Sequence, residues 1–216
     1  MPRFLRTLGY RKLSMREFIY YSKTARTTGN FDLTNLMKAG RMDIACQITI
    51  MAFFVSHHIR PDVKLHLVFD GPPDNPKHLE MFPGENIEFG GIQNRIDISK
   101  KDVAGLIKKM LYKYKKGEKT EIAPGYTIEK KGLLQLVEEM KKEGKKIFIL
   151  DRRGKDIREI KNLEDGVFIL GDQDGIPKED LKRLVKLGAE KISVGNQMYF
   201  ASQTTTIIQN ELDRRS

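Results

Sequence analysis

Two glycine-bearing segments near the carboxyl terminus have the residue types that suit small-molecule binding. The first is Gly171-Asp172-Gln173-Asp174-Gly175-Ile176-Pro177, and the second is Val194-Gly195-Asn196-Gln197-Met198-Tyr199. Each follows a short apolar run and precedes a helix-like segment, so each is predicted to leave the end of a strand. Glycine lets a ligand approach the backbone, and paired loops at neighbouring strand ends expose N–H and C=O groups. The two loops therefore predict one pocket for a nucleotide-like molecule.

Neither loop matches a known phosphate or calcium signature. The spacing differs from the dinucleotide fingerprint G-x-G-x-x-G and from the EF-hand, and no P-loop is present. Taken alone, each loop also fits an ordinary turn between a strand and a helix. The functional interpretation depends on the two loops meeting.

Charged residues stand at two other predicted element ends. In Gly40-Arg41-Met42-Asp43, Asp43 is predicted to cap the helix of residues 44–57, and Arg41 can grip a phosphate. Asp70 opens the rigid turn Asp70-Gly71-Pro72-Pro73-Asp74 and can orient a base edge or accept a proton. The alternative for the first motif is a helix cap with a surface ion pair, and the alternative for the second is a stiff turn.

Metal and disulfide chemistry find little support in the sequence. The single cysteine, Cys46, excludes an intrachain disulfide and a cysteine-based zinc site, and it favours a reducing cytoplasm. We interpret the histidines as structural or surface residues that do not combine at metal-ligand spacing; they are His57, His58, His66 and His78. We therefore expect no metal.

Composition points to a polyanionic partner. The chain has 216 residues, 39% of them hydrophobic, and a formal net charge of +10. Such an excess favours an RNA backbone, with an acidic membrane surface or a merely well-solvated surface as alternatives. No apolar run is long enough to span a bilayer, so we expect no membrane partner.

Hydrophobic periodicity predicts an alternating α/β chain. We expect strands at residues 16–21, 64–69, 146–150, 167–170 and 191–194, a hairpin within 86–98, a loop at 151–156, and helices at 44–57, 100–116, 132–143, 178–187 and 201–212. This alternation favours a parallel sheet flanked by helices on both faces. Residues 15–216 are expected to form one domain, and residues 1–14 a flexible basic extension.

Several motifs, spread in one order over the chain, resemble a known family. They are Arg16-Glu17-Phe18-Ile19, Ser22-Lys23-Thr24-Ala25, Gly40-Arg41-Met42-Asp43, Val68-Phe69-Asp70-Gly71-Pro72-Pro73-Asp74, Leu170-Gly171-Asp172-Gln173-Asp174-Gly175-Ile176-Pro177 and Ile207-Ile208-Gln209-Asn210-Glu211-Leu212-Asp213. Together they resemble the TrmY family of archaeal tRNA pseudouridine N1-methyltransferases, which is related to the ribosomal-RNA methyltransferases of the Nep1 type.

The resemblance implies a fold and an activity. The fold would be a SPOUT-type parallel sheet with a C-terminal trefoil knot, in a cytoplasmic homodimer. S-adenosyl-L-methionine would be the cofactor, and N1 of pseudouridine 54 in the tRNA T-arm the target. Methylation of a ribosomal-RNA pseudouridine, or a non-catalytic role as an RNA-binding assembly factor, remain the alternatives.

The resemblance also implies site residues. The cofactor positions would be Leu150, Gly171, Val194, Gly195, Asn196, Gln197, Met198, Tyr199 and Thr204. The catalytic candidates are Asp70, Arg41 and Asp43. The family usually has a His-Cys pair where this chain has Gln203-Thr204, so Thr204 is a departure from the pattern.

Overall fold

The structure is a computed structural model that describes residues 15–215 apart from residues 57, 85–87, 90–91 and 94–97. The expectations for residues 1–14 and for much of the hairpin within 86–98 lie outside the described residues. In chain order the elements are β1 (Arg16–Ser22), η1 (Leu36–Ala39), α1 (Met42–Phe53), β2 (Phe54–Val55), β3 (His58–Ile59), β4 (Val63–Phe69), β5 (Lys77–Met81), β6 (Glu88–Phe89), β7 (Ile92–Gln93), α2 (Lys100–Lys113), β8 (Thr120–Ala123), β9 (Tyr126–Glu129), α3 (Leu133–Lys142), β10 (Lys146–Asp156), η2 (Ile157–Glu159), β11 (Gly166–Gly171), α4 (Lys178–Lys186), β12 (Glu190–Ser193) and α5 (Ala201–Arg215).

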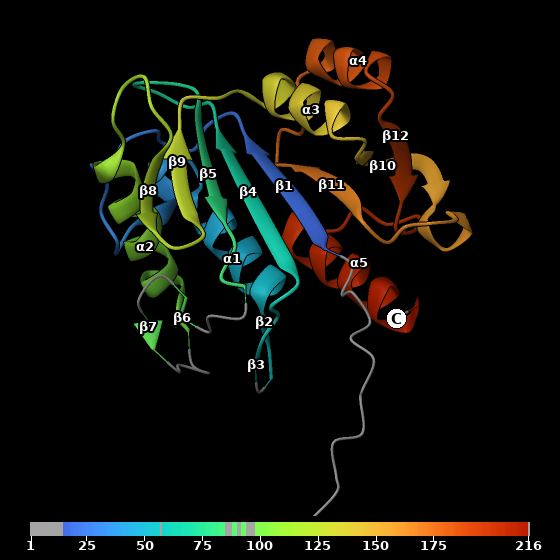
Figure 1. Ribbon diagram of the computed structural model, residues 1–216, viewed down its shortest axis with the longest axis horizontal. Helices are drawn as coiled ribbons and strands as arrows, with labels where there is room; N and C mark the ends of the chain where they lie inside the picture. The colour runs from blue at the N-terminus through green and yellow to red at the C-terminus, as the bar shows by residue number, and fades with distance from the viewer. Residues whose placement is uncertain (1–14, 57, 85–87, 90–91, 94–97, 216) are drawn as a thin grey trace, which may run out of the picture.

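One large sheet organises the described residues. Its eight strands lie in the order β12-β10-β11-β1-β4-β5-β9-β8, with β1 near the middle (Figure 1). From β12 to β4 every neighbouring pair is parallel. This places the carboxyl ends of β10, β11 and β12 at one edge, where the predicted loops begin.

The expectation of a wholly parallel sheet is wrong for three strands. The pairs β4–β5, β5–β9 and β8–β9 are antiparallel. For the pairs β4–β5 and β8–β9 the physical reason is connection length, because a parallel neighbour needs a crossover of about a dozen residues or more. Only residues 70–76 join β4 to β5, and Pro124-Gly125 alone joins β8 to β9. The sheet is therefore mixed, with its larger part parallel.

Helices cover both faces of the sheet, as predicted. The helices α1, α2 and α5 contribute to one apolar core with Phe18, Leu67 and Phe168. The helices α3 and α4 contribute to a second core on the opposite face, with Ile19 and Val68. Figure 1 shows α1 and α5 on one side of β1, and α3 with α4 on the other.

The amphipathic helices begin and end close to the predicted bounds. Ser99 caps α2, because its hydroxyl accepts from the Asp102 N–H while the Asp102 carboxylate accepts from the Ser99 N–H. Such reciprocal capping satisfies two backbone donors that the helix itself leaves free. None of the helices among the described residues has the length and apolar composition that crossing a lipid bilayer requires.

Two boundary predictions are wrong. The expected loop at residues 151–156 belongs to β10, because the ladder with β12 resumes after an irregularity between Leu150 and Lys155. The helix predicted to reach residue 57 ends at Phe53, because Phe54–Val55 turns into a short antiparallel pair with His58–Ile59. In both cases backbone pairing to another segment overrides the local pattern.

Candidate functional site

A cavity of about 590 Å³ lies at the carboxyl ends of β11 and β12 and beside the middle of β10. Both predicted glycine loops line it, since Gly171 and Gly195 are among the residues at its wall. Apolar side chains from the strand ends, including Leu150, Leu170 and Ile192, form much of its surface. The cavity thus combines apolar walls with loop backbone, as predicted. The two loops do not follow neighbouring strands, however, because β10 lies between β11 and β12.

Asp172 fixes the loop that follows β11. Its Oδ2 accepts from the Ser22 hydroxyl and from the Lys23 N–H, each at 2.9 Å, and its Oδ1 accepts from the Asp174 N–H at 3.0 Å. The carboxylate is buried and also lines the cavity. Because these bonds join the end of β1 to the loop, Asp172 holds one wall of the cavity in place.

The glycines of the two loops have different structural roles. A Cβ built on Gly171 would lie 2.8 Å from the Gly175 Cα, so the loop folds back on itself too closely for a side chain. Gly195 has a φ of +133°, and the space beside it is open. The first glycine allows close backbone packing, and the second allows a backbone conformation that side-chain-bearing residues rarely adopt.

The extended part of β10 adds a charged contact at the same edge. Lys191 on β12 donates to the Asp151 carboxylate at 2.7 Å. This hydrogen bond, together with the Arg153 N–H, lowers the pKa of Asp151. Asp151 and Arg152 both line the cavity, so its rim carries charges of both signs.

Most of the predicted cofactor residues come together at this cavity. Asn196 is exposed and does not line it. The others do line it: Leu150, Gly171, Val194, Gly195, Gln197, Met198, Tyr199 and Thr204. Their shared position is a finding, whereas their roles as cofactor ligands stay predictions.

Arg41 and Asp43 lie on the cavity wall as an ion pair. Arg41 Nε donates to Asp43 Oδ1 and Arg41 Nη2 to Asp43 Oδ2, both at 3.0 Å. The prediction that Asp43 caps the helix is wrong, because α1 begins at Met42 and Arg41 occupies the N-cap position with a φ of 62°. Asp43 instead stands in the first turn, where a carboxylate still interacts favourably with the helix dipole.

Asp70 stands at the same edge of the sheet but outside the cavity wall. Its Oδ2 accepts from the Tyr21 hydroxyl, and its Oδ1 accepts from the Asn75 amide, each at 3.1 Å. Burial and the Asp70 carboxylate raise the pKa of Tyr21, so the phenol stays a donor. The side chain that we predicted to act on a base is therefore oriented, but it does not contact the cavity.

Apolar side chains are exposed beside the cavity. Met198 is 80% exposed and Phe200 is 77% exposed, and Tyr199 lies between them. All three line the cavity mouth on the loop that leads into α5. An apolar patch of this kind is typical of a surface that another molecule covers.

Sequence reasoning missed several residues of the cavity wall. Asp172 and Gln173 belong to the quoted glycine motif, so the motif signalled them without assigning a role. Gln47 on α1 and Phe200 before α5 also line the cavity. No local pattern signals them, because only the packing of α1 and α5 beside the strand ends brings them there.

The prediction that no histidines combine is wrong for His66 and His78. His66 Nδ1 lies 2.9 Å from His78 Nε2, and both rings are buried. Their rings stack with centroids 5.1 Å apart, on strands that pair antiparallel. This contact lies in the middle of the sheet and takes no part in the cavity.

Comparison with known proteins places the chain in a family. Residues 15–216 match a family model described as "Putative SAM-dependent RNA methyltransferase". The chain belongs to this family. Membership covers every element of the fold, including the loops that line the cavity.

Curated members of the family are similar over nearly the whole chain. The tRNA (pseudouridine(54)-N(1))-methyltransferase of Methanosarcina mazei is 37% identical over 93% of this chain and 92% of its own length. That of Methanocaldococcus jannaschii is 32% identical over 93% of this chain and 98% of its own. The resemblance that the sequence motifs indicated is confirmed.

A solved structure shares the fold of this family member. The structure of Archaeoglobus fulgidus Nep1 bound to S-adenosylhomocysteine superposes with a TM-score of 0.61, covering 93% of this chain and 98% of that one. The two sequences are 15% identical, so the likeness concerns the arrangement of strands and helices.

Proposed function

We propose that this protein is a methyltransferase that uses S-adenosyl-L-methionine to methylate N1 of pseudouridine 54 in the T-arm of tRNA. The observation that carries the proposal is its similarity, at 37% identity over 93% of the chain, to a curated enzyme named for that reaction. The cavity formed by the glycine loops supplies the place for the cofactor.

The cavity fits a cofactor of this class. Its volume of about 590 Å³ lies within the range of roughly 300–1,000 Å³ for small-molecule sites. The open space beside Gly195 lets a ligand reach the loop backbone, and apolar walls at Leu150 and Val194 suit an adenine ring. When bound, S-adenosylmethionine supplies an electrophilic methyl group.

The nucleoside itself explains the selectivity of the proposed reaction. Pseudouridine is joined to ribose through carbon, so its N1 carries a hydrogen, whereas N1 of uridine is bonded to the sugar. Methylation would break the S–CH₃ bond of S-adenosylmethionine, form an N1–CH₃ bond, and release S-adenosylhomocysteine and the N1 proton. A protein group or a water molecule must accept that proton.

Asp70 is the residue that we assign to the base. Its carboxylate is held by Tyr21 and Asn75 just after β4, outside the cavity wall. Asp70 would orient the base or accept the N1 proton. Extruding the base from its stack costs a few kcal/mol.

The charge of the protein supports RNA as the partner. The formal net charge is +10, and such an excess strengthens binding to a phosphate backbone. Arg41, whose side chain is 37% exposed, would hold a phosphate beside the cavity. Asp43 accepts from Nε and Nη2 of this guanidinium, so the N–H donors of Nη1 would be the ones that contact the phosphate.

The finer features of the fold and assembly are also part of the proposal. We infer a trefoil knot formed by the loops after β10, β11 and β12, and a homodimer in the cytoplasm. Exposed Met198 and Phe200 support a covered surface beside the cavity. Size-exclusion chromatography with light scattering tests the dimer, and a monomeric mass at micromolar concentration would reject it.

Nucleoside analysis tests the proposed activity. The protein is incubated with S-adenosylmethionine and T-arm RNA that contains either pseudouridine or uridine at position 54, and the digested nucleosides are analysed by mass spectrometry. We expect N1-methylpseudouridine from the first RNA and no product from the second. Absence of product from the pseudouridine RNA, with bound cofactor, would reject the assignment.

The same experiment separates the alternatives. A small-subunit ribosomal-RNA hairpin containing pseudouridine serves as a third substrate, and methylation of that hairpin alone would favour the Nep1-type reaction. Calorimetry with S-adenosylmethionine tests the remaining alternative. A protein that binds RNA but shows no saturable cofactor site would be a non-catalytic assembly factor.

A further inference from the structure

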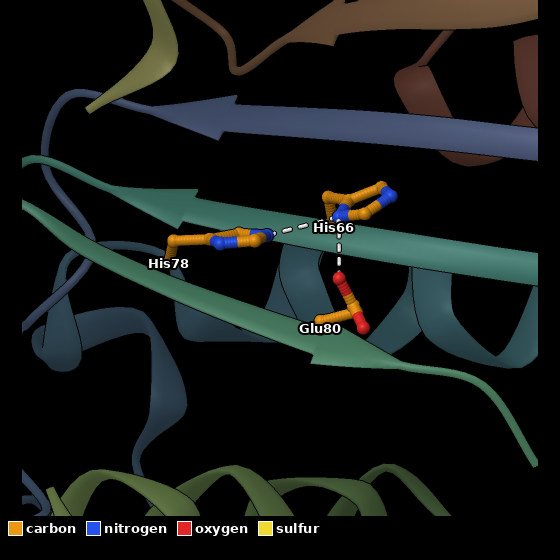
Figure 2. Close-up of side chains that lie close together, drawn as sticks. All are labelled: His66, His78 and Glu80. Carbon is orange, nitrogen blue, oxygen red and sulfur yellow. Dashed lines mark hydrogen bonds and ion pairs between the residues drawn. The ribbon is translucent and has the colours of Figure 1, made fainter. Parts of the chain in front are cut away.

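A second cluster of chemically active side chains lies far from the cavity edge, in the middle of the sheet. Figure 2 shows His66 of β4 and His78 and Glu80 of β5 turned toward one another. His66 Nδ1 lies 2.9 Å from His78 Nε2 and 3.9 Å from Glu80 Oε2. The register explains the contact, because His66 pairs directly with Glu80 and Val68 pairs with His78.

The three atoms have the separation that a metal ion requires. Ligand atoms about 2.0–2.2 Å from a tetrahedral metal lie roughly 3.3–3.6 Å from each other. The distances of 2.9 and 3.9 Å fall on either side of that value, and all three ligand atoms lie within 4.8 Å of one another. Small side-chain rotations would equalise them.

Each histidine has a carboxylate behind its other ring nitrogen. His78 Nδ1 lies 3.1 Å from Glu129 Oε1, and His66 Nε2 lies 3.7 Å from Glu17 Oε2. Metal-binding histidines typically donate their second N–H to a carboxylate, which fixes the ring and raises its basicity. The pair of His78 and Glu129 on β9 shows this arrangement, and Glu17 on β1 stands near His66 Nε2 without a hydrogen bond to it.

Without a metal, two neutral imidazole rings cannot give every ring nitrogen of this cluster a hydrogen-bond partner. If His78 Nδ1–H donates to Glu129, its Nε2 must accept from His66 Nδ1–H. His66 Nε2 then carries a lone pair facing the Glu17 carboxylate, and this buried atom has no hydrogen-bond partner among the described residues. A metal on the inner nitrogens leaves both outer nitrogens as N–H donors to carboxylates.

We propose that His66, His78 and Glu80 bind one divalent transition-metal ion, with Zn²⁺ the best fit to two imidazoles and one carboxylate. Three protein ligands leave a fourth position for water. The ion would clasp β4 to β5, at the junction between the parallel and antiparallel parts of the sheet. This inference departs from the expectation of no metal, and it is independent of the proposed methyl transfer.

The surrounding charges allow the ion to enter. Glu80 is 20% exposed and contacts Lys119 at 3.4 Å, and Lys119 is itself 45% exposed. Binding displaces this contact, which has little intrinsic strength, and replaces the hydrogen bond between His66 and His78 with two bonds to the metal.

Zinc titration of the untagged, full-length protein tests the site. After dialysis against a chelator, isothermal calorimetry with ZnCl₂ at pH 7.5 should give one saturable site, and saturating zinc should raise the unfolding temperature. The isosteric change Glu80→Gln should weaken zinc binding at least tenfold. Glu129→Gln should weaken it ten- to a hundred-fold, because it replaces the charged carboxylate acceptor beside His78 with a neutral amide.

A matched control distinguishes this site from surface binding. His58 is exposed and lies outside the cluster, so His58→Asn should leave zinc affinity unchanged. His66→Asn should abolish binding, and if that variant does not fold, the two glutamine variants decide. No saturable zinc binding by the wild type, equal affinity in Glu80→Gln, or loss of binding in His58→Asn would each overturn the proposal.

Discussion

Gly171→Ala should weaken cofactor binding because the added methyl group has no room. The new Cβ would lie 2.8 Å from both the Gly175 Cα and its carbonyl carbon, and 3.0 Å from the Ile176 nitrogen. These are backbone atoms, so relief requires the loop of residues 171–176 to shift. Overpacking of this kind costs about 1–3 kcal/mol, which corresponds to roughly 5- to 150-fold in a dissociation constant.

Calorimetric titration with S-adenosylmethionine measures the effect, and urea denaturation of the same variant measures stability. If the loop stays strained in the ligand-free protein, the variant loses free energy of unfolding. If the loop instead shifts to relieve the strain, the variant loses affinity for S-adenosylmethionine. Gly105→Ala is the matched control. Gly105 lies on α2, where an added Cβ meets nothing within 4 Å, so affinity should be unchanged and stability should rise slightly.

Wild-type affinity together with wild-type stability in Gly171→Ala would refute the reasoning. It would mean that the loop accepts a side chain freely and that its close packing is not needed. Equal loss of affinity in Gly105→Ala would also contradict the account, because that change lies away from the cavity.

Three other perturbations test separate parts of the structure. Asp70→Ala should reduce turnover at least tenfold while leaving S-adenosylmethionine affinity intact, since Asp70 is outside the cavity wall; full activity in single-turnover assays would dismiss its role. Arg16→Met should lower the unfolding free energy by about 3–5 kcal/mol, because Arg16 pairs with buried Asp62 at 2.9 Å and donates to Gln209 at 2.8 Å. The control is Arg158, which is exposed and pairs with Asp156. Arg158→Met should leave the urea midpoint unchanged. Burial raises the pKa of Cys46 to about 12, so the thiol stays almost wholly protonated at pH 8.5. Cys46 should therefore react with an alkylating reagent only after unfolding, and rapid labelling of the folded protein would contradict this. Because folding favours the neutral thiol, its contribution to the free energy of unfolding should fall as the pH rises above about 9.

Local sequence patterns predicted the amphipathic helices well. The apolar positions of α3 and the capping pair Ser99 and Asp102 of α2 carry their information within one or two turns. The start of α1 could not be predicted in the same way. Gly40 and Arg41 both adopt left-handed backbone conformations, with φ values of 69° and 62°, and an arginine in that conformation has no local signal.

Features that depend on strand pairing were also beyond the sequence. The long course of β10 follows from its renewed pairing with β12 beyond Leu150, and the antiparallel edge follows from short connections. The meeting of His66 and His78 depends on the register of β4 and β5, which the turn at residues 70–76 sets. Twelve residues separate the two histidines in the chain, so their spacing suggested no common site.

The cavity was more predictable than the residues around it. Strand–loop–helix order at β11 and β12 places their loops at one edge, so Gly171 and Gly195 could be expected at one pocket. Asp70 lies outside the cavity wall because its strand, β4, is not adjacent to the strands whose loops form the cavity. In the sheet β1 separates β4 from β11, and neighbouring strands stand about 4.8 Å apart.

The most direct test of the central claim is a crystal structure of the protein with S-adenosylmethionine or its demethylated product. The account predicts ligand density inside the cavity at the ends of β11 and β12 and beside the middle of β10, in contact with the Gly171 and Gly195 loops. Density at any other place, with this cavity empty under saturating ligand, would contradict it.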